Sequence, residues 1–150
     1  MPLDRSFIGR SYPPAPVYEV GREKIREFAD AVGATSALHR DPEEARLAGY
    51  RDVVAPPTFA VILSASANSV VVDDPDLGID YSRVVHGEQR FVHHRPITAG
   101  DRLVAAIHVD EIITKLGNDF LTVRAEITTE AGEPVTTVTA MLVARGKEES

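Results

Sequence analysis

Residues 56–72 restrict the fold of this chain more than any other stretch. The segment begins with Pro56 and Pro57, which suit the first turn of a helix because the N–H group that proline lacks would be unpaired there. An uncharged run follows, and its apolar or small residues fall on every face of a helix, which is typical of a helix buried on all sides. The sequence therefore predicts one long central helix with the rest of the chain packed around it. The alternative is an ordinary buried helix in another α+β fold.

The composition excludes several classes of protein. The chain has 23 acidic and 16 basic residues and a net charge of -7, so we expect neither nucleic acid nor a membrane as a partner, because both attract basic patches. It contains no cysteine, which excludes disulfides, thiolate metal sites and cysteine nucleophiles. The N-terminus lacks the basic-then-apolar layout of a signal peptide, and the length is 150 residues. We therefore expect a single domain, residues 1–150, in the cytoplasm.

The period of the apolar residues changes along the chain. Apolar residues at i, i+3, i+4 and i+7 predict an amphipathic helix over residues 22–32, and a second short helix follows Asp41. From Tyr81 onward the period is two, which predicts strands over residues 83–94, 102–114, 120–129 and 135–145. Helices followed by an antiparallel meander indicate an α+β fold in which the sheet curls around the central helix.

Three segments together carry a resemblance to a known family. They cover residues 18–28, 49–59 and 85–101. In them the chain resembles the MaoC-like dehydratases, and more narrowly the actinobacterial proteins that include the non-catalytic subunits of (3R)-hydroxyacyl-ACP dehydratase. The resemblance implies the hot-dog fold, in which an antiparallel sheet wraps around a long central helix. It also implies a dimer whose two sheets join edge to edge, with each acyl pocket at the dimer interface.

Dehydration of a 3-hydroxyacyl thioester needs a base for the α-proton, an acid for the leaving hydroxyl and donors for the developing enolate. The resemblance implies that a loop motif, Gly-Asp-x-Asn-Pro-(aliphatic)-His, supplies the acid–base pair. The Gly, aliphatic and His positions of that motif are matched here by Gly33, Leu38 and His39. The Asp, Asn and Pro positions hold Ala34, Ser36 and Ala37. His39 is thus the candidate catalytic base without its carboxylate partner, or, alternatively, a loop histidine with no catalytic role.

Further candidates follow from the strands and from the central helix. His86 and Glu88, two residues apart on a predicted strand, form a fallback catalytic pair if they point to one face, and otherwise a polar pair at the strand edge. His93 and His94 are expected on opposite faces and match no zinc motif, so we expect no metal and no cofactor. The residues expected to bind the substrate are Pro57, Thr58, Phe59, Asn68 and Arg95.

The resemblance implies a subunit of an (R)-specific 3-hydroxyacyl thioester dehydratase or enoyl hydratase in fatty-acid metabolism. We expect the chain to shape the acyl-binding tunnel for an ACP or CoA thioester, as a homodimer or as a heterodimer with a catalytic hot-dog subunit. The alternative is an acyl-thioester-binding protein without catalysis. A hot-dog thioesterase ranks last, because that reaction needs a carboxylate to activate water and residues 56–72 contain neither Asp nor Glu.

Overall fold

The computed structural model describes residues 2–146 and is built on one antiparallel sheet. The strand order is β1-β3-β4-β5-β2. The strands are β1 (Tyr18–Glu19), β2 (Val84–His93), β3 (Arg102–Lys115), β4 (Asn118–Thr129) and β5 (Pro134–Ala144). On β4 every second residue from Leu121 to Ile127 is buried, as the period-two pattern predicts. The four long strands therefore agree with the sequence-based prediction to within two residues at each end.

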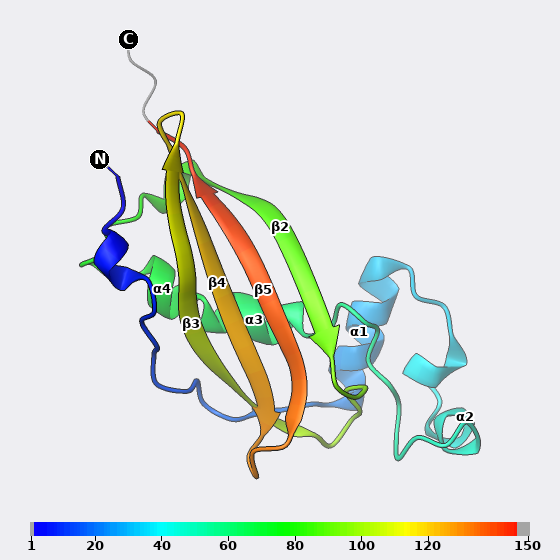
Figure 1. Ribbon diagram of the computed structural model, residues 1–150. Coiled ribbons are helices and arrows are strands. Elements are labelled where there is room, and N and C mark those ends of the chain that lie inside the picture. Colours follow the sequence, from blue (N-terminus) through cyan, green and yellow to red (C-terminus); the bar gives the residue numbers. More distant parts are fainter. Residues whose placement is uncertain (1, 147–150) are drawn as a thin grey trace.

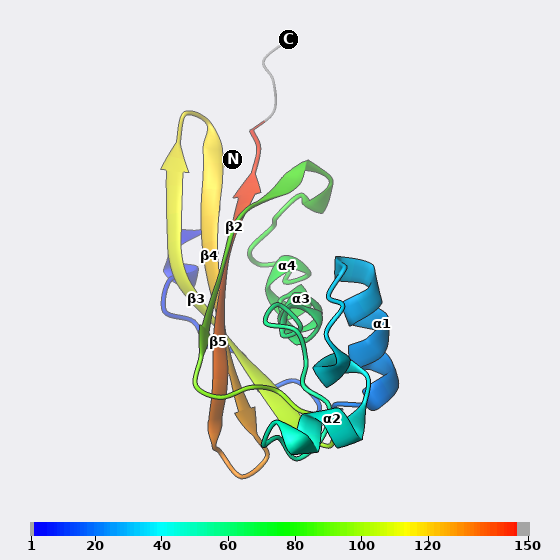
Figure 2. The ribbon, with the colours of Figure 1, turned by 90° about the vertical axis from the view of Figure 1, so that its right-hand side faces the viewer.

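The helices form further layers on one face of this curled sheet (Figures 1 and 2). Helices α3 (Val61–Ala67) and α4 (Ser69–Val72) lie against the sheet, and α1 (Arg22–Val32) lies on the far side of α3 (Figure 2). The ring of Phe28 on α1 meets that of Phe59 edge-on, with the centroids 5.6 Å apart. Helix α2 (Pro42–Leu47) and three 3-10 turns, Arg5–Phe7, Ala37–His39 and Tyr81–Arg83, complete the elements. The predicted α+β arrangement of a sheet around a central helix is confirmed.

The central helix differs from its prediction in length and in burial. Residues 57–60 form turns, and α3 begins only at Val61, because the N–H groups of Phe59 and Val61 bond to carbonyls three residues back. The helix is interrupted at Asn68, where the Ser69 hydroxyl donates to the Ser66 carbonyl at 2.8 Å and competes with the backbone pattern. Ala65, Ser66, Ser69 and Val70 are exposed, so burial on all sides was wrong. No helix within residues 2–146 is long and apolar enough to span a membrane.

The two edges of the sheet differ in what covers them. The N-terminal arm follows the outer edge of β3, where the N–H groups of Gly9, Tyr12 and Ala15 donate to carbonyls of that strand at 2.8–3.0 Å. The outer edge of β2 has no strand partner within residues 2–146. Val85 and Val92 on this strand are 42% and 49% exposed. An unpaired strand with exposed valines is a ready surface for pairing with another chain.

Candidate functional site

The loop after α1 places His39. Helix α1 ends at Gly33, whose φ of 73° is a left-handed conformation that glycine adopts without strain. The chain then enters the 3-10 turn Ala37–His39, whose first N–H groups are capped because the Ser36 hydroxyl oxygen accepts from the Leu38 N–H at 3.2 Å. His39 is the last residue of that turn, so local sequence signals fix its position between α1 and α2.

Two hydrogen bonds hold His39 against residue 54. The ring Nδ1 lies 2.6 Å from the Val54 carbonyl oxygen, and the Val54 N–H donates to the Leu38 carbonyl at 2.9 Å. Because a carbonyl only accepts, the ring proton must be on Nδ1 when the imidazole is neutral, which leaves the lone pair on Nε2. His39 is thus oriented to accept a proton through Nε2.

His39 lines a cavity of about 450 Å³. Three separate segments form its walls: the 3-10 turn with His39, the segment before α3, and the end of β2 with the chain that follows. The lining residues are His39, Val54, Ala55, Pro56, Pro57, His93, His94, Arg95, Pro96 and Ile97. These side chains are mostly apolar, with three imidazoles and one guanidinium, and no carboxylate is among them. A partly apolar cavity with a few polar groups is typical of a small-molecule site.

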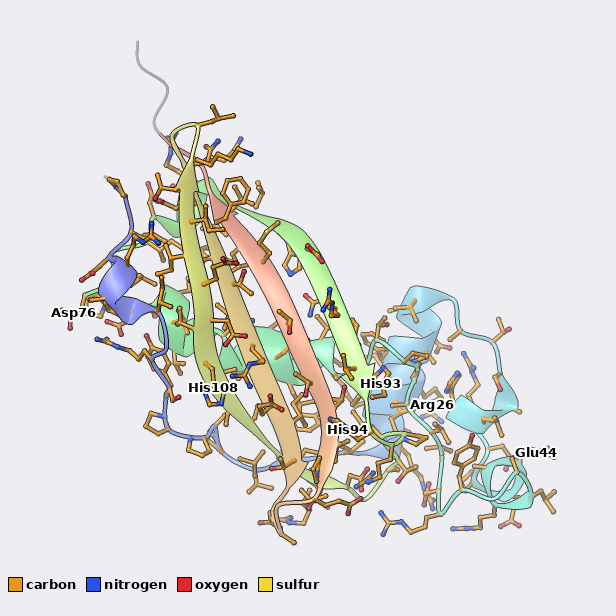
Figure 3. All side chains as sticks on the ribbon, viewed as in Figure 1. Arg26, Glu44, Asp76, His93, His94 and His108 are labelled. Carbon is orange, nitrogen blue, oxygen red and sulfur yellow. The ribbon has the colours of Figure 1, made fainter. Side chains whose placement is uncertain are left out.

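His93 and His94 were not predicted as residues of this site. Figure 3 shows both near the C-terminal end of β2 and His108 on β3. His93 faces the helices and stacks on Phe91 at 5.9 Å, whereas His94 lies beyond the last residue of β2, where strand alternation no longer applies. Both line the cavity of His39. Among residues 2–146 no cluster of three or more His, Asp or Glu side chains is arranged to hold a metal ion.

Arg95 lies at the edge of this cavity in a network of ion pairs. Its guanidinium donates to both carboxylate oxygens of Asp101, at 2.9 and 3.0 Å, and to Glu133 at 2.7 Å. Asp101 is buried, with its side chain 3% exposed, and also accepts from the Thr98 N–H at 2.9 Å. Burial raises the pKa of Asp101, but the hydrogen bonds from Arg95 and Thr98 outweigh that effect and hold the pKa below its usual value. Most donors of Arg95 are therefore used to fix the turn behind the cavity.

This ion pair gives a pH-dependent stability. Asp101 has a lowered pKa in the folded state, so its contribution is complete above the unfolded pKa of about 3.9 and is lost as the pH falls through the folded pKa. Asp101→Asn should lower the free energy of unfolding by about 1.5–3 kcal/mol at pH 7, and its difference from the wild type should shrink as the pH falls below about 3.9. Urea unfolding at pH 7 and at several pH values below about 4 checks this. The half-exposed Asp110, paired with Arg124, is the control, and Asp110→Asn should cost no more than about 1 kcal/mol.

His86 and Glu88 do not lie on one face, so the condition for the fallback catalytic pair is not met. His86 is opposite the buried Leu142 of β5, whereas Glu88 is opposite the outward-facing Met141, because a β-bulge at Gly87 inserts one residue between them. A Cβ atom at Gly87 would lie 2.8 Å from the Met141 side chain. The two side chains therefore point to opposite faces of the sheet and cannot act as base and orienting carboxylate.

The remaining candidate residues do not all lie at the cavity of His39. Pro57 is exposed and lines the cavity of His39. Thr58 is exposed but does not line it, and Phe59 is fully buried behind it against Phe28. Asn68 lies in a different cavity, described below. Ala34 bonds through its N–H to the Ala29 carbonyl at 2.8 Å and is not among the lining residues.

Known proteins resemble this chain in sequence and in structure. The family described as FAS1-like, dehydratase domain region matches residues 6–138. A UPF0336 protein of Saccharopolyspora erythraea is 68% identical over 99% of this chain and 96% of its own length. The truncated HadBC (3R-hydroxyacyl-ACP dehydratase) complex of Mycobacterium tuberculosis contains a chain with a TM-score of 0.82 and 34% identity, covering 91% of this chain and 96% of that one. A MaoC-like dehydratase has a TM-score of 0.88 and 34% identity, over 95% of this chain and 43% of that one.

Proposed function

Because the chain belongs to the FAS1-like dehydratase domain family, we propose that it is a subunit of an (R)-specific 3-hydroxyacyl thioester dehydratase, an enzyme that in reverse hydrates a trans-2-enoyl thioester. The observation that carries the proposal is the cavity in which His39 presents Nε2 and no lining residue is a carboxylate. The chain holds the acyl thioester, on ACP or CoA, and a partner hot-dog chain in the cytoplasm completes the acid–base pair.

The chemistry explains why one histidine is not enough. Dehydration removes a proton from the α-carbon and returns a proton to the leaving hydroxyl, and a positioned group contributes about 10²–10⁴-fold to such a transfer. His39 Nε2 is oriented to accept the first proton. At the position where the family motif has Asp, this chain has Ala34, whose methyl group neither binds a proton nor orients water. We therefore expect the chain by itself to catalyse the dehydration, or the reverse hydration, only slowly.

The proposed partner is a second hot-dog chain that pairs with the free edge of β2. Within residues 2–146 no strand pairs with its outer edge, and it exposes Val85 and Val92. The structurally similar HadBC protein is named as a complex, and the matched chain of it is 34% identical to this chain. A heterodimer with a chain that has the complete motif supplies the missing carboxylate, whereas a homodimer does not. The heterodimer is therefore the assembly that we propose.

The second candidate function is acyl-thioester binding without catalysis. The absence of a carboxylate among the residues that line the cavity is the observation that favours this candidate, whereas the oriented His39 favours the dehydratase subunit. The two candidates differ in one respect, because a binding protein needs no catalytic partner. Thioester hydrolysis is less well supported, since α3 and α4 contain neither Asp nor Glu to activate water.

Binding in the cavity is tested by calorimetry with a trans-2-octenoyl pantetheine thioester. Pro57→Trp places a large ring at an exposed position on the cavity wall and should weaken binding by at least about tenfold, because it occupies the space of the acyl group. Pro75→Trp, at an exposed loop proline outside the cavity, is the matched control and should bind like the wild type. Equal weakening by both variants, or no binding by the wild type, would refute the proposed site.

A further inference from the structure

A second cavity lies on the inner side of β2, between that strand and helices α3 and α4. Its volume is about 270 Å³, and it shares no lining residue with the cavity of His39. Asn68, between the two helices, forms part of one wall, and His86 and Gln89 of β2 form part of the other. The bulge at Gly87 is what turns His86 towards this cavity rather than away from it.

Two residues that line this cavity each carry a buried polar atom without a hydrogen-bond partner. Within residues 2–146, the buried side-chain atoms without a hydrogen-bond partner are Asn68 Oδ1 and Gln89 Nε2. Asn68 is only 9% exposed. A buried polar atom that makes no hydrogen bond costs about 1–3 kcal/mol, so native structures contain few of them. Here the two residues that carry the acceptor and the donor, Asn68 and Gln89, line the same cavity.

The rest of the lining restricts what binds between these two amides. Apolar side chains, among them Val61, Val72 and Leu142, form much of the wall. No lysine or arginine lines the cavity, and Asp73 does, so an anionic group is disfavoured. The fitting ligand has an apolar body and one neutral group that both donates and accepts a hydrogen bond. A hydroxyl and an amide have this property.

We propose that Asn68 and Gln89 bind a neutral hydroxyl or amide group of the acyl thioester, at a site remote from the reacting carbon. The inference rests on the proposed function for the nature of the ligand. Gln89 and His93 are four residues apart on the inner face of β2, which corresponds to about 13 Å along the strand. The group comes either from a hydroxyl on the acyl chain or from an amide of the pantetheine arm, and both sources offer the same chemistry.

The test uses ligands that contain no enoyl thioester, so that its outcome does not depend on catalysis. Calorimetry measures the binding affinity of dodecanoate, 12-hydroxydodecanoate and pantetheine. Each ligand is titrated into the wild type, Asn68→Leu and Gln89→Met. If the source is the acyl chain, the wild type should bind the hydroxylated chain about tenfold more tightly than the plain one, and both variants should lose that preference. If the source is the carrier arm, pantetheine should bind to the wild type, and its affinity for both variants should be about tenfold lower.

Thermal unfolding separates this role from a structural one. Asn68→Leu and Gln89→Met remove polar atoms that have no partner, so the melting temperature should stay the same or rise. The control is Asn118→Leu, which removes an amide that accepts from the Gly146 N–H at 3.0 Å and should lower the melting temperature by about 2–4 °C.

Three results would overturn the proposal. The first is that both variants bind all three probes with the same affinity as the wild type. Another is a loss of stability in the two variants as large as in Asn118→Leu. The third is dissociation of a dimer in the variants without any change in ligand preference, which would assign the two amides to a partner chain. Failure of the enoyl thioester to react would contradict the proposed function but leave these measurements intact.

Discussion

Replacing Ala34 by aspartate is expected to raise the rate at which the protein hydrates a trans-2-enoyl thioester by about 100-fold. Ala34 holds the position of the motif's carboxylate, and the Gly, aliphatic and His positions of the motif are kept as Gly33, Leu38 and His39. Gly33 keeps the left-handed conformation that ends α1, Ser36 caps the turn, and His39 is bonded to residue 54. Ala34 itself does not line the cavity of His39, so the longer aspartate side chain has to reach the bound substrate to restore the second member of the acid–base pair. Loss of the enoyl absorbance with time measures the rate.

Three controls separate acid–base chemistry from a change in charge or shape. Ala34→Asn has the same shape without a titratable group and should give no gain. Thr35→Asp adds the same charge at the next exposed position, which the motif leaves unspecified, and should also give none. Combining Ala34→Asp with His39→Ala should remove the gain. A correctly folded Ala34→Asp protein with unchanged activity would show that the loop does not bring residue 34 and His39 to the same substrate.

Replacing Phe59 by alanine is expected to lower the free energy of unfolding by about 3–5 kcal/mol. Phe59 is fully buried, in the turn between Pro57 and the start of α3, and it packs edge-on against Phe28 of α1. Truncation leaves a cavity where α1 meets the start of the central helix, and it removes an aromatic pair worth about 0.5–1.5 kcal/mol beyond the area that it buries.

Chemical unfolding in urea measures this loss. The control is Leu47→Ala at the end of α2, where the side chain is 82% exposed and the change should stay within about 0.5 kcal/mol. The loss for Phe59→Leu should lie between those for Phe59→Ala and Leu47→Ala, since leucine retains part of the buried volume. A cost below about 1 kcal/mol for Phe59→Ala would contradict the packing of α1 on the central helix.

The elements with a strong local signal could be predicted from the sequence. Helix α1 has both an apolar stripe and a glycine C-cap, and its predicted bounds agree with Arg22–Val32. The strands have a clear period of two on their buried faces. The central helix was predicted less well, because periodicity reports apolar residues but not the turn of residues 57–60 or the competing Ser69 hydroxyl. The bulge at Gly87 depends on packing against Met141, which is far away in the sequence.

The site could be predicted only in part for the same reason. The resemblance to the MaoC-like dehydratases singled out His39 and the missing carboxylate at Ala34. The bond from His39 to the Val54 carbonyl depends on the tertiary fold, and so does the approach of His93 and His94. These residues belong to separate segments that no local pattern connects. The unpartnered atoms of Asn68 and Gln89 are likewise visible only once α3 and β2 face each other.

The central claim is that this chain binds the acyl thioester but needs a partner's carboxylate for catalysis. The most direct measurement is the steady-state hydration of a trans-2-octenoyl thioester by the isolated chain, by a hot-dog chain with the complete Asp–His motif, and by the two together. We expect the isolated chain to turn over well below about 1 s⁻¹ and the mixture to exceed the sum of the separate rates by at least about 100-fold. Turnover by the isolated chain at about 1–10³ s⁻¹, the ordinary range for enzymes, would contradict the claim.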